Sequence, residues 1–248
     1  MSALLRTERL HKAFGSLVVT RDVDLEIRRG ERHALIGPNG AGKTSLVHQL
    51  GGQLAPTSGR ILFEGRDITG LAPEAVCRLG IARTFQKNNL FRGLSVRENV
   101  RLAVQARRGT PYAPLASIHA NRSLWTRADD LLAQVRLTDG IDRKVAEISY
   151  GEQRQLEIAV ALAAEPALLL LDEPTSGMSP AETDNMVRLV ESLPRSLALL
   201  MIEHDMSVVF SLADRITVLY YGEVLATGTP NEIRADARVR EVYLGVTH

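Results

Sequence analysis

The spacing of hydrophobic residues changes near residue 30. Before this point, the apolar positions predict short strands at residues 4–10, 18–19 and 23–27. In the last of these, Val23, Leu25 and Ile27 alternate with acidic residues. Because side chains in a strand alternate between its two faces, this pattern predicts a sheet with one solvated face.

Continuous apolar runs replace this alternation from residue 32 onward. They occur at residues 33–36, 167–171, 197–202 and 216–219, and each is bounded by turn residues or by a helical pattern. Short runs of this kind suit strands that are buried on both faces. They are typical of a mainly parallel sheet in an α/β fold.

Strand signals are missing between residues 94 and 137. Helical patterns at 96–107 and 122–136 flank a less regular link at 109–114. We therefore expect a helical subdomain inserted into the α/β core, over approximately residues 94–165. Residues 230–244 predict short polar helices.

Composition narrows the class of protein. The chain has 248 residues, enough for one large domain with a subdomain, and its 30 Lys and Arg nearly balance its 29 Asp and Glu. The net charge of +1 disfavours a nucleic-acid-binding or polybasic membrane-anchoring role. The apolar runs are far shorter than the roughly 20 residues that span a bilayer.

Two further features favour a cytoplasmic location. The single cysteine, Cys77, cannot form an intrachain disulfide, which suits a reducing compartment. Near the N-terminus, Arg6, Glu8 and Arg9 interrupt the apolar core that a signal peptide needs, so we expect this segment to be retained.

The strongest chemical signal is the stretch at residues 37–44, which matches G-x-x-x-x-G-K-[ST] between a buried strand and a helical pattern. Glycines let backbone N–H groups approach phosphate oxygens, and the following helix adds its N-terminal N–H groups. Lys43 suits the β- and γ-phosphates and the Thr44 hydroxyl suits Mg²⁺; an ordinary glycine-rich turn is the alternative. The candidate nucleotide-binding residues are Gly37, Pro38, Asn39, Gly40, Ala41, Gly42, Lys43, Thr44 and Ser45.

A pair of carboxylates follows the apolar run at 168–171. Asp172 and Glu173 end this predicted strand, and ligands of parallel sheets bind at the carboxyl ends of strands. Asp172 is therefore a candidate for holding Mg²⁺ through water, and Glu173 for activating the water that attacks a phosphate. The alternative is a solvated acidic turn before Pro174.

A second candidate anion site lies at residues 149–153. Ser149 followed by Glu152 forms a capping box, which predicts that a helix begins here. Capping does not explain Gly151 in the first turn, where alanine would be more stable by ~1 kcal/mol. Close approach of a phosphate would explain this glycine, but the spacing alone leaves a plain helix cap equally open.

The order of these motifs resembles that of the ATP-binding cassette (ABC) ATPases along essentially the whole chain. The glycine-rich loop is followed by Gln86, the signature ISYGEQ at 148–153, LLLLDEP at 168–174 and His204. The resemblance implies one domain over residues 1–248 with an α/β fold. It also implies a P-loop NTPase of RecA-like, mainly parallel sheet, with an N-terminal antiparallel β subdomain and the inserted helical subdomain.

The same resemblance implies roles that spacing cannot show. ATP and Mg²⁺ are the expected ligands, with Phe14 stacked on adenine and Gln86 touching Mg²⁺ and the attacking water. His204 should bond the γ-phosphate and position Glu173. The signature residues Ser149, Gly151 and Gln153 should complete the site of a second subunit in a head-to-tail dimer. Taken singly, Phe14, Gln86 and His204 could instead be a core aromatic, a loop amide and a strand-end histidine.

Within this family the chain is most similar to the ATPase subunits of branched-chain amino acid and amide importers. The supporting segments are 83–86, 90–91, 95–100, the long link around 107–125, 177–180, 202–206 and 243–245, while a lipopolysaccharide-export ATPase shares part of this set. Two positions depart from the general family pattern: Tyr150 replaces the first signature glycine, and Ser179 replaces an aspartate.

The resemblance predicts the ATP-hydrolysing subunit of an importer on the cytoplasmic face of the membrane. Its expected partners are a second ABC ATPase, identical or paralogous, two permeases and, indirectly, a solute-binding protein. The alternatives are an exporter, a non-transport ABC ATPase of DNA repair or ribosomes, and a P-loop kinase or GTPase. A kinase or GTPase would leave residues 149–153 and His204 without a role.

Overall fold

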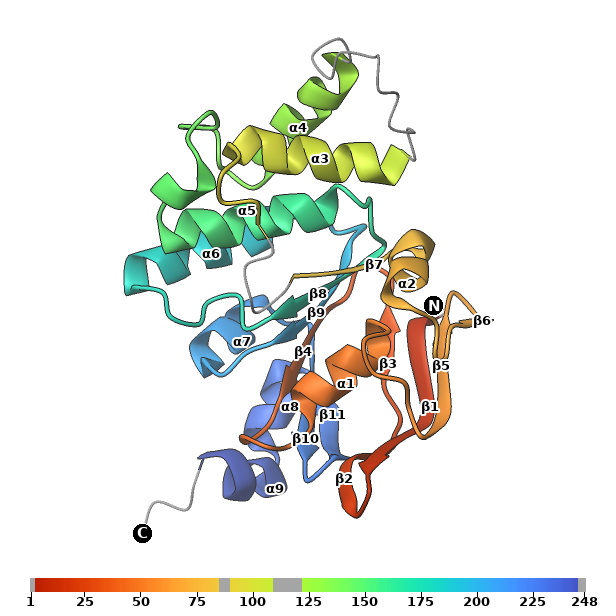
Figure 1. Cartoon of the computed structure of the whole chain (residues 1–248). Helices are drawn as coiled ribbons and strands as arrows, with labels where there is room; N and C mark the ends of the chain where they lie inside the picture. Colours follow the sequence, from red (N-terminus) through yellow and green to blue (C-terminus); the bar gives the residue numbers. More distant parts are fainter. Residues whose placement is uncertain (1–2, 85–89, 109–121, 245–248) are drawn as a thin grey trace.

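A six-stranded sheet forms the centre of the molecule. The computed structural model describes residues 3–84, 90–108 and 122–244. The strand order is β11-β10-β4-β9-β8-β7, and all neighbours are parallel except the antiparallel pair β10–β11. The strands are β4 (Arg32–Ile36), β7 (Ile81–Arg83), β8 (Leu168–Asp172), β9 (Ala198–Ile202), β10 (Arg215–Tyr220) and β11 (Glu223–Gly228) (Figure 1).

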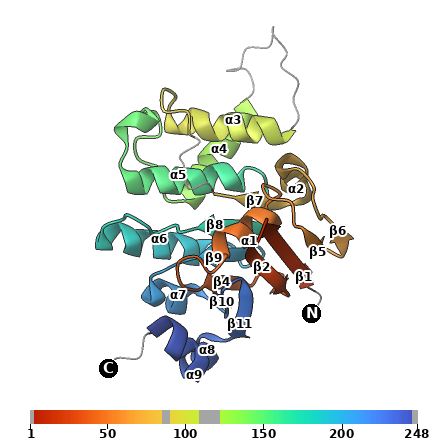
Figure 2. The same cartoon turned by 60° about the horizontal axis from the view of Figure 1, so that its bottom comes forward.

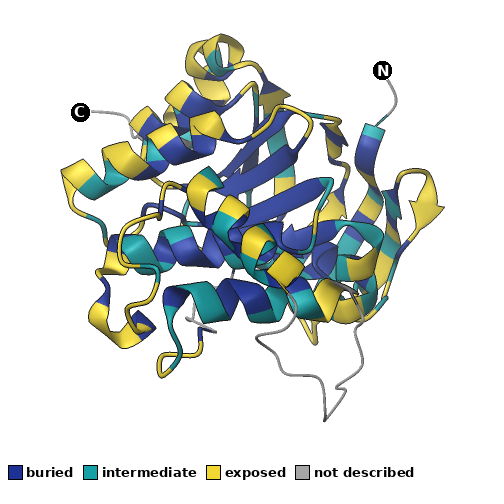
Figure 3. Ribbon diagram, turned by 90° about the horizontal axis from the view of Figure 1, so that it is seen from above, coloured by how far each residue is buried: buried dark blue, intermediate teal, exposed yellow. Residues whose placement is uncertain are grey.

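The central strands are buried on both faces, as their apolar runs predicted. Every residue of β4, β8 and β9 is buried, and Figure 3 shows these strands between layers of partly exposed helices. Alternate side chains enter two different cores: Leu169 and Leu171 pack with the helices on one side, and Leu168 and Leu170 pack on the other. The parallel α/β sheet is therefore confirmed.

The N-terminal half supplies a second sheet, which is antiparallel. Its main order is β2-β1-β5-β6, with β3 also paired to β1. The strands are β1 (Ala3–Phe14), β2 (Leu17–Val23), β3 (Glu26–Arg28), β5 (Ser58–Phe63) and β6 (Arg66–Asp67). Its apolar face packs with α1 (Lys43–Leu50), which lies beside β1 and β2 in Figure 2.

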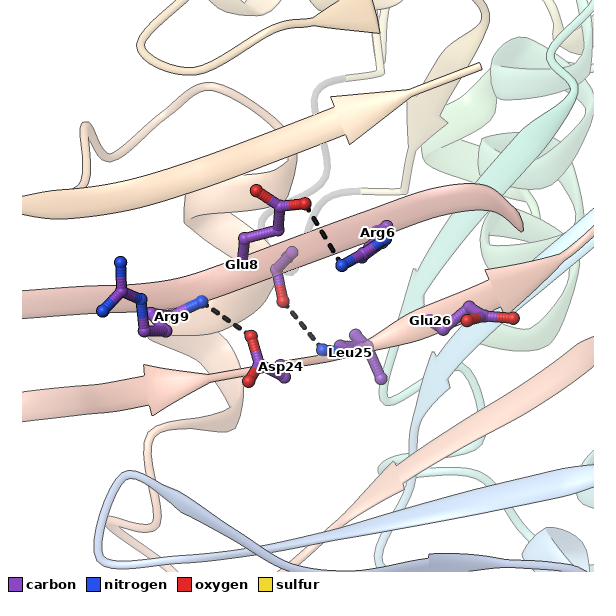
Figure 4. Close-up of a pocket in the computed structure, with 7 residues that line it drawn as sticks. Arg6, Glu8, Arg9, Asp24, Leu25 and Glu26 are labelled. Atoms are coloured by element: carbon purple, nitrogen blue, oxygen red, sulfur yellow. Dashed lines mark hydrogen bonds and ion pairs between the residues drawn. The ribbon is translucent and has the colours of Figure 1, made fainter. Parts of the chain in front are cut away.

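The predicted strands of this sheet were wrong in their bounds. Residues 4–10 and 18–19 lie within the longer strands β1 and β2. Residues 23–27 divide between the end of β2 and the start of β3, because side chains interrupt the ladder. Asp24 Oδ1 accepts the backbone N–H of Arg9 at 2.7 Å, and the N–H of Leu25 donates to Thr7 Oγ1 at 2.8 Å. Figure 4 shows this break in the pairing, and the residues around it line a surface hollow of about 510 Å³.

Helices follow β7 and precede β8. They are α3 (Val96–Arg108), α4 (Arg122–Gln134), the short turn η2 (Val145–Glu147) and α5 (Tyr150–Leu162), all within residues 94–165, where a helical subdomain is expected. Leu131 and Leu156 belong to the same hydrophobic core as Leu169 of the sheet. The helical layer is thus packed directly on the central sheet.

The remaining helices complete the layers and the C-terminal end. They are α2 (Pro73–Leu79), α6 (Pro180–Ser192), α7 (Met206–Leu212), α8 (Pro230–Ala235), α9 (Ala237–Val239) and the terminal turn η3 (Arg240–Leu244). The last three match the short helices expected at 230–244. Within the described residues, none of the helices combines the length and apolar character needed to cross a membrane.

Candidate functional site

Residues 37–42 join the carboxyl end of β4 to α1, and two of the glycines are required by contacts with other strands. A Cβ on Gly42 would lie 2.2 Å from the carbonyl oxygen of Val19 in β2. A Cβ on Gly37 would lie 2.2 Å from the carbonyl oxygen of Leu219 in β10. The loop is therefore held between the two sheets in a conformation that only glycine fits.

The start of α1 is free to bind an anion. Its N-cap is Gly42, no side chain among the described residues caps it, and its first turn has no acidic residue. The first N–H groups of a helix have no partners within it and carry the positive end of the helix dipole. Asn39 and Gly40 are exposed, so this concave backbone is accessible to a phosphate group.

Lys43 lies beneath the loop. Its ammonium Nζ donates to the carbonyl oxygens of Gly37 and Pro38, at 2.7 and 3.1 Å. Burial lowers the pKa of Lys43, while the nearby carboxylates Glu173 and Asp172 act in the opposite direction. The motif thus has its cation next to the acidic pair that ends β8.

Asp172 is suited to a hydrated cation. The side chain is buried, and its Oδ2 accepts Nη2 of Arg83 at 2.5 Å. Its other oxygen, Oδ1, is buried with no hydrogen-bond partner among the described residues. A buried carboxylate oxygen needs a hydrogen-bond partner, and water bound to Mg²⁺ would supply one, so Asp172 fits the ion.

Glu173 and His204 meet at the carboxyl ends of β8 and β9. Nε2 of His204 lies 2.9 Å from Oε1 of Glu173, and both side chains remain partly accessible. The backbone N–H of Glu173 donates to Ile202 in β9, at 3.0 Å, and its φ of +50° turns the chain away from the strand. The carboxylate of Glu173 can accept a proton from water, while the imidazole of His204 holds this carboxylate in position.

Sequence reasoning missed the residue that joins these two loops. Glu203 is only 2% exposed, and its Oε1 accepts the backbone N–H and the hydroxyl of Thr175, at 2.9 and 2.7 Å. Its Oε2 accepts the backbone N–H of His204 at 3.2 Å. Glu203 therefore ties the loop of Glu173 to the loop of His204. The available signal was an acidic residue at the end of a buried apolar run.

The signature segment lies at the start of α5, in the helical layer. Ser149 is the N-cap, its Oγ accepts the N–H of Glu152 at 3.2 Å, and the capping box is complete. Gly151 is buried, and the amide of Gln153 donates to the carbonyl oxygen of Ile148 at 3.2 Å. α5 packs against α3, α4, α6 and β7, and Figure 1 shows it in the helical layer, apart from α1 and the loop that precedes α1.

The two departures from the family pattern have structural explanations. The hydroxyl of Tyr150 accepts two N–H groups of Arg154, at 3.0 and 2.7 Å, and its ring lies 3.7 Å from where a Cβ on Gly177 would be. Tyr150 therefore lies against the loop that follows β8. Ser179 is the N-cap of α6, and its Oγ accepts the N–H of Glu182 at 3.4 Å.

Of the two remaining predicted residues, the structure describes Phe14. Phe14 ends β1 and is 53% exposed, with Nζ of Lys12 lying 4.9 Å from its ring centroid. It is not a core aromatic, and its hairpin adjoins the P-loop through Val19. Gln86 lies outside the described residues.

Two family models match parts of the chain. Residues 20–176 match the family model described as ABC transporter. Residues 223–248 match the model described as branched-chain amino acid ATP-binding cassette transporter.

Three relatives align over nearly the whole chain. This chain is 39% identical to LivG of Salmonella typhimurium and 36% identical to BraF of Pseudomonas aeruginosa. Both relatives are named high-affinity branched-chain amino acid transport ATP-binding proteins. Each comparison covers 98% of this chain and 98% of the relative. The lipopolysaccharide export system ATP-binding protein LptB of Acidithiobacillus ferridurans is 35% identical, covering 99% of this chain and 98% of that protein.

Solved structures show the same fold. An ATP-binding cassette of an ABC transporter in its ADP conformation is 28% identical with a TM-score of 0.86, covering 99% of this chain and all of that one. The structure of a nucleotide-free ATP-binding cassette has a TM-score of 0.85 with the same identity and coverage. The family match spans more than half of the chain, and the relatives exceed 30% identity along its length. The chain belongs to the ABC transporter family and is one of its ATP-hydrolysing cassettes.

Proposed function

We propose that this cassette powers the uptake of branched-chain amino acids or related amides, with Glu173 as the base for ATP hydrolysis. The proposed catalytic role is supported by the position of three segments at the carboxyl ends of neighbouring strands. The P-loop follows β4, Glu173 follows β8 and His204 follows β9, and these strands are neighbours in the sheet. A triphosphate on the P-loop would extend toward the carboxylate and the imidazole.

The hydrolytic step assigns one task to each group. A water oxygen bonds to the γ-phosphorus, the bond to the bridging oxygen of ADP breaks, and Glu173 accepts the proton of the water. Lys43 and the N-terminus of α1 bind the phosphate charge, and His204 holds Glu173 and the γ-phosphate in place. Mg²⁺, held by Thr44, Asp172 and Gln86, would neutralise charge on the β- and γ-phosphates.

Binding of ATP is proposed to join two cassettes head to tail. Ser149, Gly151 and Gln153 of one subunit would then contact the γ-phosphate bound to Lys43 of the other. The separation of α5 from α1 of its own chain, visible in Figure 1, supports this arrangement. Two permeases would convert closing and opening of the pair into transport at the cytoplasmic face of the membrane, and a solute-binding protein would deliver the solute.

The substrate class is proposed from the relatives and from the C-terminal match at residues 223–248. Uptake of labelled leucine in a strain lacking this chain tests it. We expect wild-type protein to restore uptake and Glu173→Gln to fail. If leucine uptake is normal in the deletion strain while lipopolysaccharide export is impaired, the export role of LptB applies instead.

Hydrolysis is tested with the same substitution. Glu173→Gln preserves the shape of the side chain but removes the base, so we expect turnover to fall by at least about 10²-fold, as removal of a general base does. Binding of ATP should be retained. Glu223→Gln, in an exposed ion pair with Arg21, is the control and should hydrolyse normally. Near-normal turnover of Glu173→Gln would remove Glu173 from its role.

A further inference from the structure

The start of the signature helix is covered by α6. Gly151 is buried although it stands in the first turn of α5, where backbone N–H groups have no partners within the helix. A Cβ built on Gly151 would lie 2.9 Å from Oε1 of Glu182, the third residue of α6. The side chain of Glu182 thus occupies the space in front of Gly151.

The two oxygens of Glu182 face different helices. Its Oε2 accepts the backbone N–H and the hydroxyl of Ser179, at 3.0 and 2.7 Å, and so caps its own helix. Its Oε1 is the oxygen nearest to Gly151. Hydrogen bonds from the backbone and side chain of Ser179 lower the pKa of Glu182, and the backbone N–H of Gly151 contributes in the same direction.

The space around this carboxylate is a small pocket of about 110 Å³ between α5 and α6. Its lining includes Ser149, Gly151, Glu182, Met178 and Asn185. The pocket therefore contains the two signature residues that are expected to bind the γ-phosphate, together with two carboxylates of the chain itself. Glu152 is paired with Arg143 and caps its own helix, whereas Glu182 comes from α6 and faces Gly151.

We propose that the carboxylate of Glu182 is an internal competitor of the γ-phosphate for the N-terminus of the signature helix. This inference rests on the proposed function, in which Ser149 and Gly151 serve the nucleotide of a second subunit. Helix N-termini bind carboxylates and phosphates for the same reason, because both present negative oxygens to free N–H groups and to the positive dipole end.

This competition gives Glu182 a role when the two cassettes associate and separate. Two negative charges about 4 Å apart repel by about 1 kcal/mol in water and by more in a partly excluded site. The γ-phosphate must therefore displace Glu182 from Gly151 when the dimer closes. When phosphate leaves after hydrolysis, Glu182 can return to Gly151, which favours the separated subunits.

The chain offers a matched pair of substitutions for a test. Glu182→Gln removes the charge but keeps a side chain that is equally accepted in a capping box. Glu232→Gln is the control, because Glu232 caps α8 with Thr229 in the same geometry, with the backbone N–H at 2.7 Å and the hydroxyl at 3.0 Å. Any effect common to both variants reflects a weaker helix cap.

The first measurement is dimer formation, with Glu173→Gln added to block hydrolysis. Sedimentation is followed while MgATP is titrated. We expect Glu182→Gln to lower the ATP concentration at half-dimerisation at least about fivefold, which is the effect of ~1 kcal/mol, while Glu232→Gln leaves it unchanged. The difference should shrink at high salt, because salt screens the repulsion. Equal midpoints for all variants would overturn the role of Glu182 and leave the proposed function standing.

The second measurement needs no dimer. In the monomer, the NMR shift of the Gly151 amide proton should follow the protonation of the Glu182 carboxyl as the solution is acidified. In Glu182→Gln this titration should be reduced to the part due to the Glu152 carboxyl, which lines the same pocket, and in Glu232→Gln it should remain complete. A Gly151 signal that does not respond to the loss of Glu182 would overturn the contact and the proposal. If no variant dimerises, even with the cognate subunits, the proposed head-to-tail site fails instead.

Discussion

Two glycines of the P-loop show how the absence of a Cβ atom shapes this loop. Gly42 and Gly40 both adopt positive φ, of +100° and +79°. They differ in surroundings, because a Cβ on Gly42 would overlap the carbonyl oxygen of Val19, whereas a Cβ on Gly40 would meet no atom of the described part of the chain within 4 Å. Gly40 is therefore favoured only by its backbone conformation, whereas Gly42 is also required by the close contact with β2.

This contrast predicts unequal effects of alanine. Gly42→Ala combines an unfavourable φ with a backbone overlap, so we expect it to reduce the free energy of unfolding by about 3 kcal/mol and to abolish ATP binding. Gly40→Ala carries only the conformational cost of about 1 kcal/mol. Urea unfolding and titration with a fluorescent ATP analogue measure both. Similar losses for the two variants would show that contact with β2 does not shape the loop.

At this scale, the sequence predicts residues whose chemistry is local. The P-loop, the pair Asp172 and Glu173, and the N-cap Ser149 were recognisable because their spacing along the chain carries the signal. The buried partners Arg83 and Glu203 were not. Each contacts a residue more than 25 positions away in sequence, and no local pattern reports such pairing.

Between elements, Glu203 connects the loop after β8 to the loop after β9. It is buried and accepts three hydrogen bonds from Thr175 and His204. A buried donor that loses its acceptor costs roughly 1–3 kcal/mol. The geometry of Glu173 and His204 consequently depends on a residue that is not expected to touch ATP.

We therefore predict that Glu203→Ala lowers both stability and turnover. The free energy of unfolding should fall by about 3 kcal/mol, and kcat should fall at least about tenfold, because displacement of catalytic groups by about 1 Å can reduce rates 10²-fold. Binding of ATP, measured as Kd, should change far less than kcat. Glu203→Gln keeps the volume and one acceptor, so its losses should be smaller.

An exposed carboxylate supplies the control for this prediction. Glu223 forms a surface ion pair with Arg21, and such pairs contribute little to stability. Glu223→Ala should change the free energy of unfolding by no more than about 0.5 kcal/mol and leave kcat unaltered. If Glu203→Ala behaved like Glu223→Ala, the connection between the loops would have no energetic importance.

Elements were predictable where burial alone decides them. The fully buried strands β4, β8 and β9 follow from continuous apolar runs. Strand β7 has only three residues, and the link between β2 and β3 is interrupted by side-chain hydrogen bonds of Thr7 and Asp24. Such short or irregular pieces depend on pairing partners that the local sequence does not reveal.

For the whole molecule, the sequence supports the family and the fold, but contacts between α5 and α6 required the structure. The capping boxes at Ser149 and Ser179 can each be read from the chain. That Glu182 of the second box lies against Gly151 of the first follows only from how the helices pack. The proposed completion of the ATP site by another subunit likewise exceeds what one chain can contain.

Carboxylates at helix starts and turns also link the whole fold to pH. Hydrogen bonds from neighbouring groups hold several pKa values below their ordinary range, in Asp67, Glu182, Asp205, Glu232 and Asp236. The pKa of Asp236 falls from 3.8 to about 2, mainly because the Arg238 side chain hydrogen-bonds to it. Burial acts oppositely on Glu157, whose pKa is raised despite its pairing with Arg154.

These shifts predict loss of stability in acid. A carboxyl whose pKa is lower in the folded state stabilises the fold above its unfolded pKa, and this contribution disappears as the pH falls through the folded pKa. Because the lowered values outnumber the raised one of Glu157, the free energy of unfolding should decline between about pH 4.5 and pH 2. Urea midpoints at several pH values measure this slope.

Asp236 allows the pH effect to be assigned to one contact. Arg238→Gln removes the main donor, so the pKa of Asp236 should rise toward 3.8, measured by NMR of its carboxyl carbon. Asp236→Asn keeps an N-cap for α9 but cannot titrate, so the stability of this variant should depend less steeply on pH below 4. An unchanged slope would show that Asp236 is equally acidic in the unfolded chain, and that its contact with Arg238 does not contribute to folding.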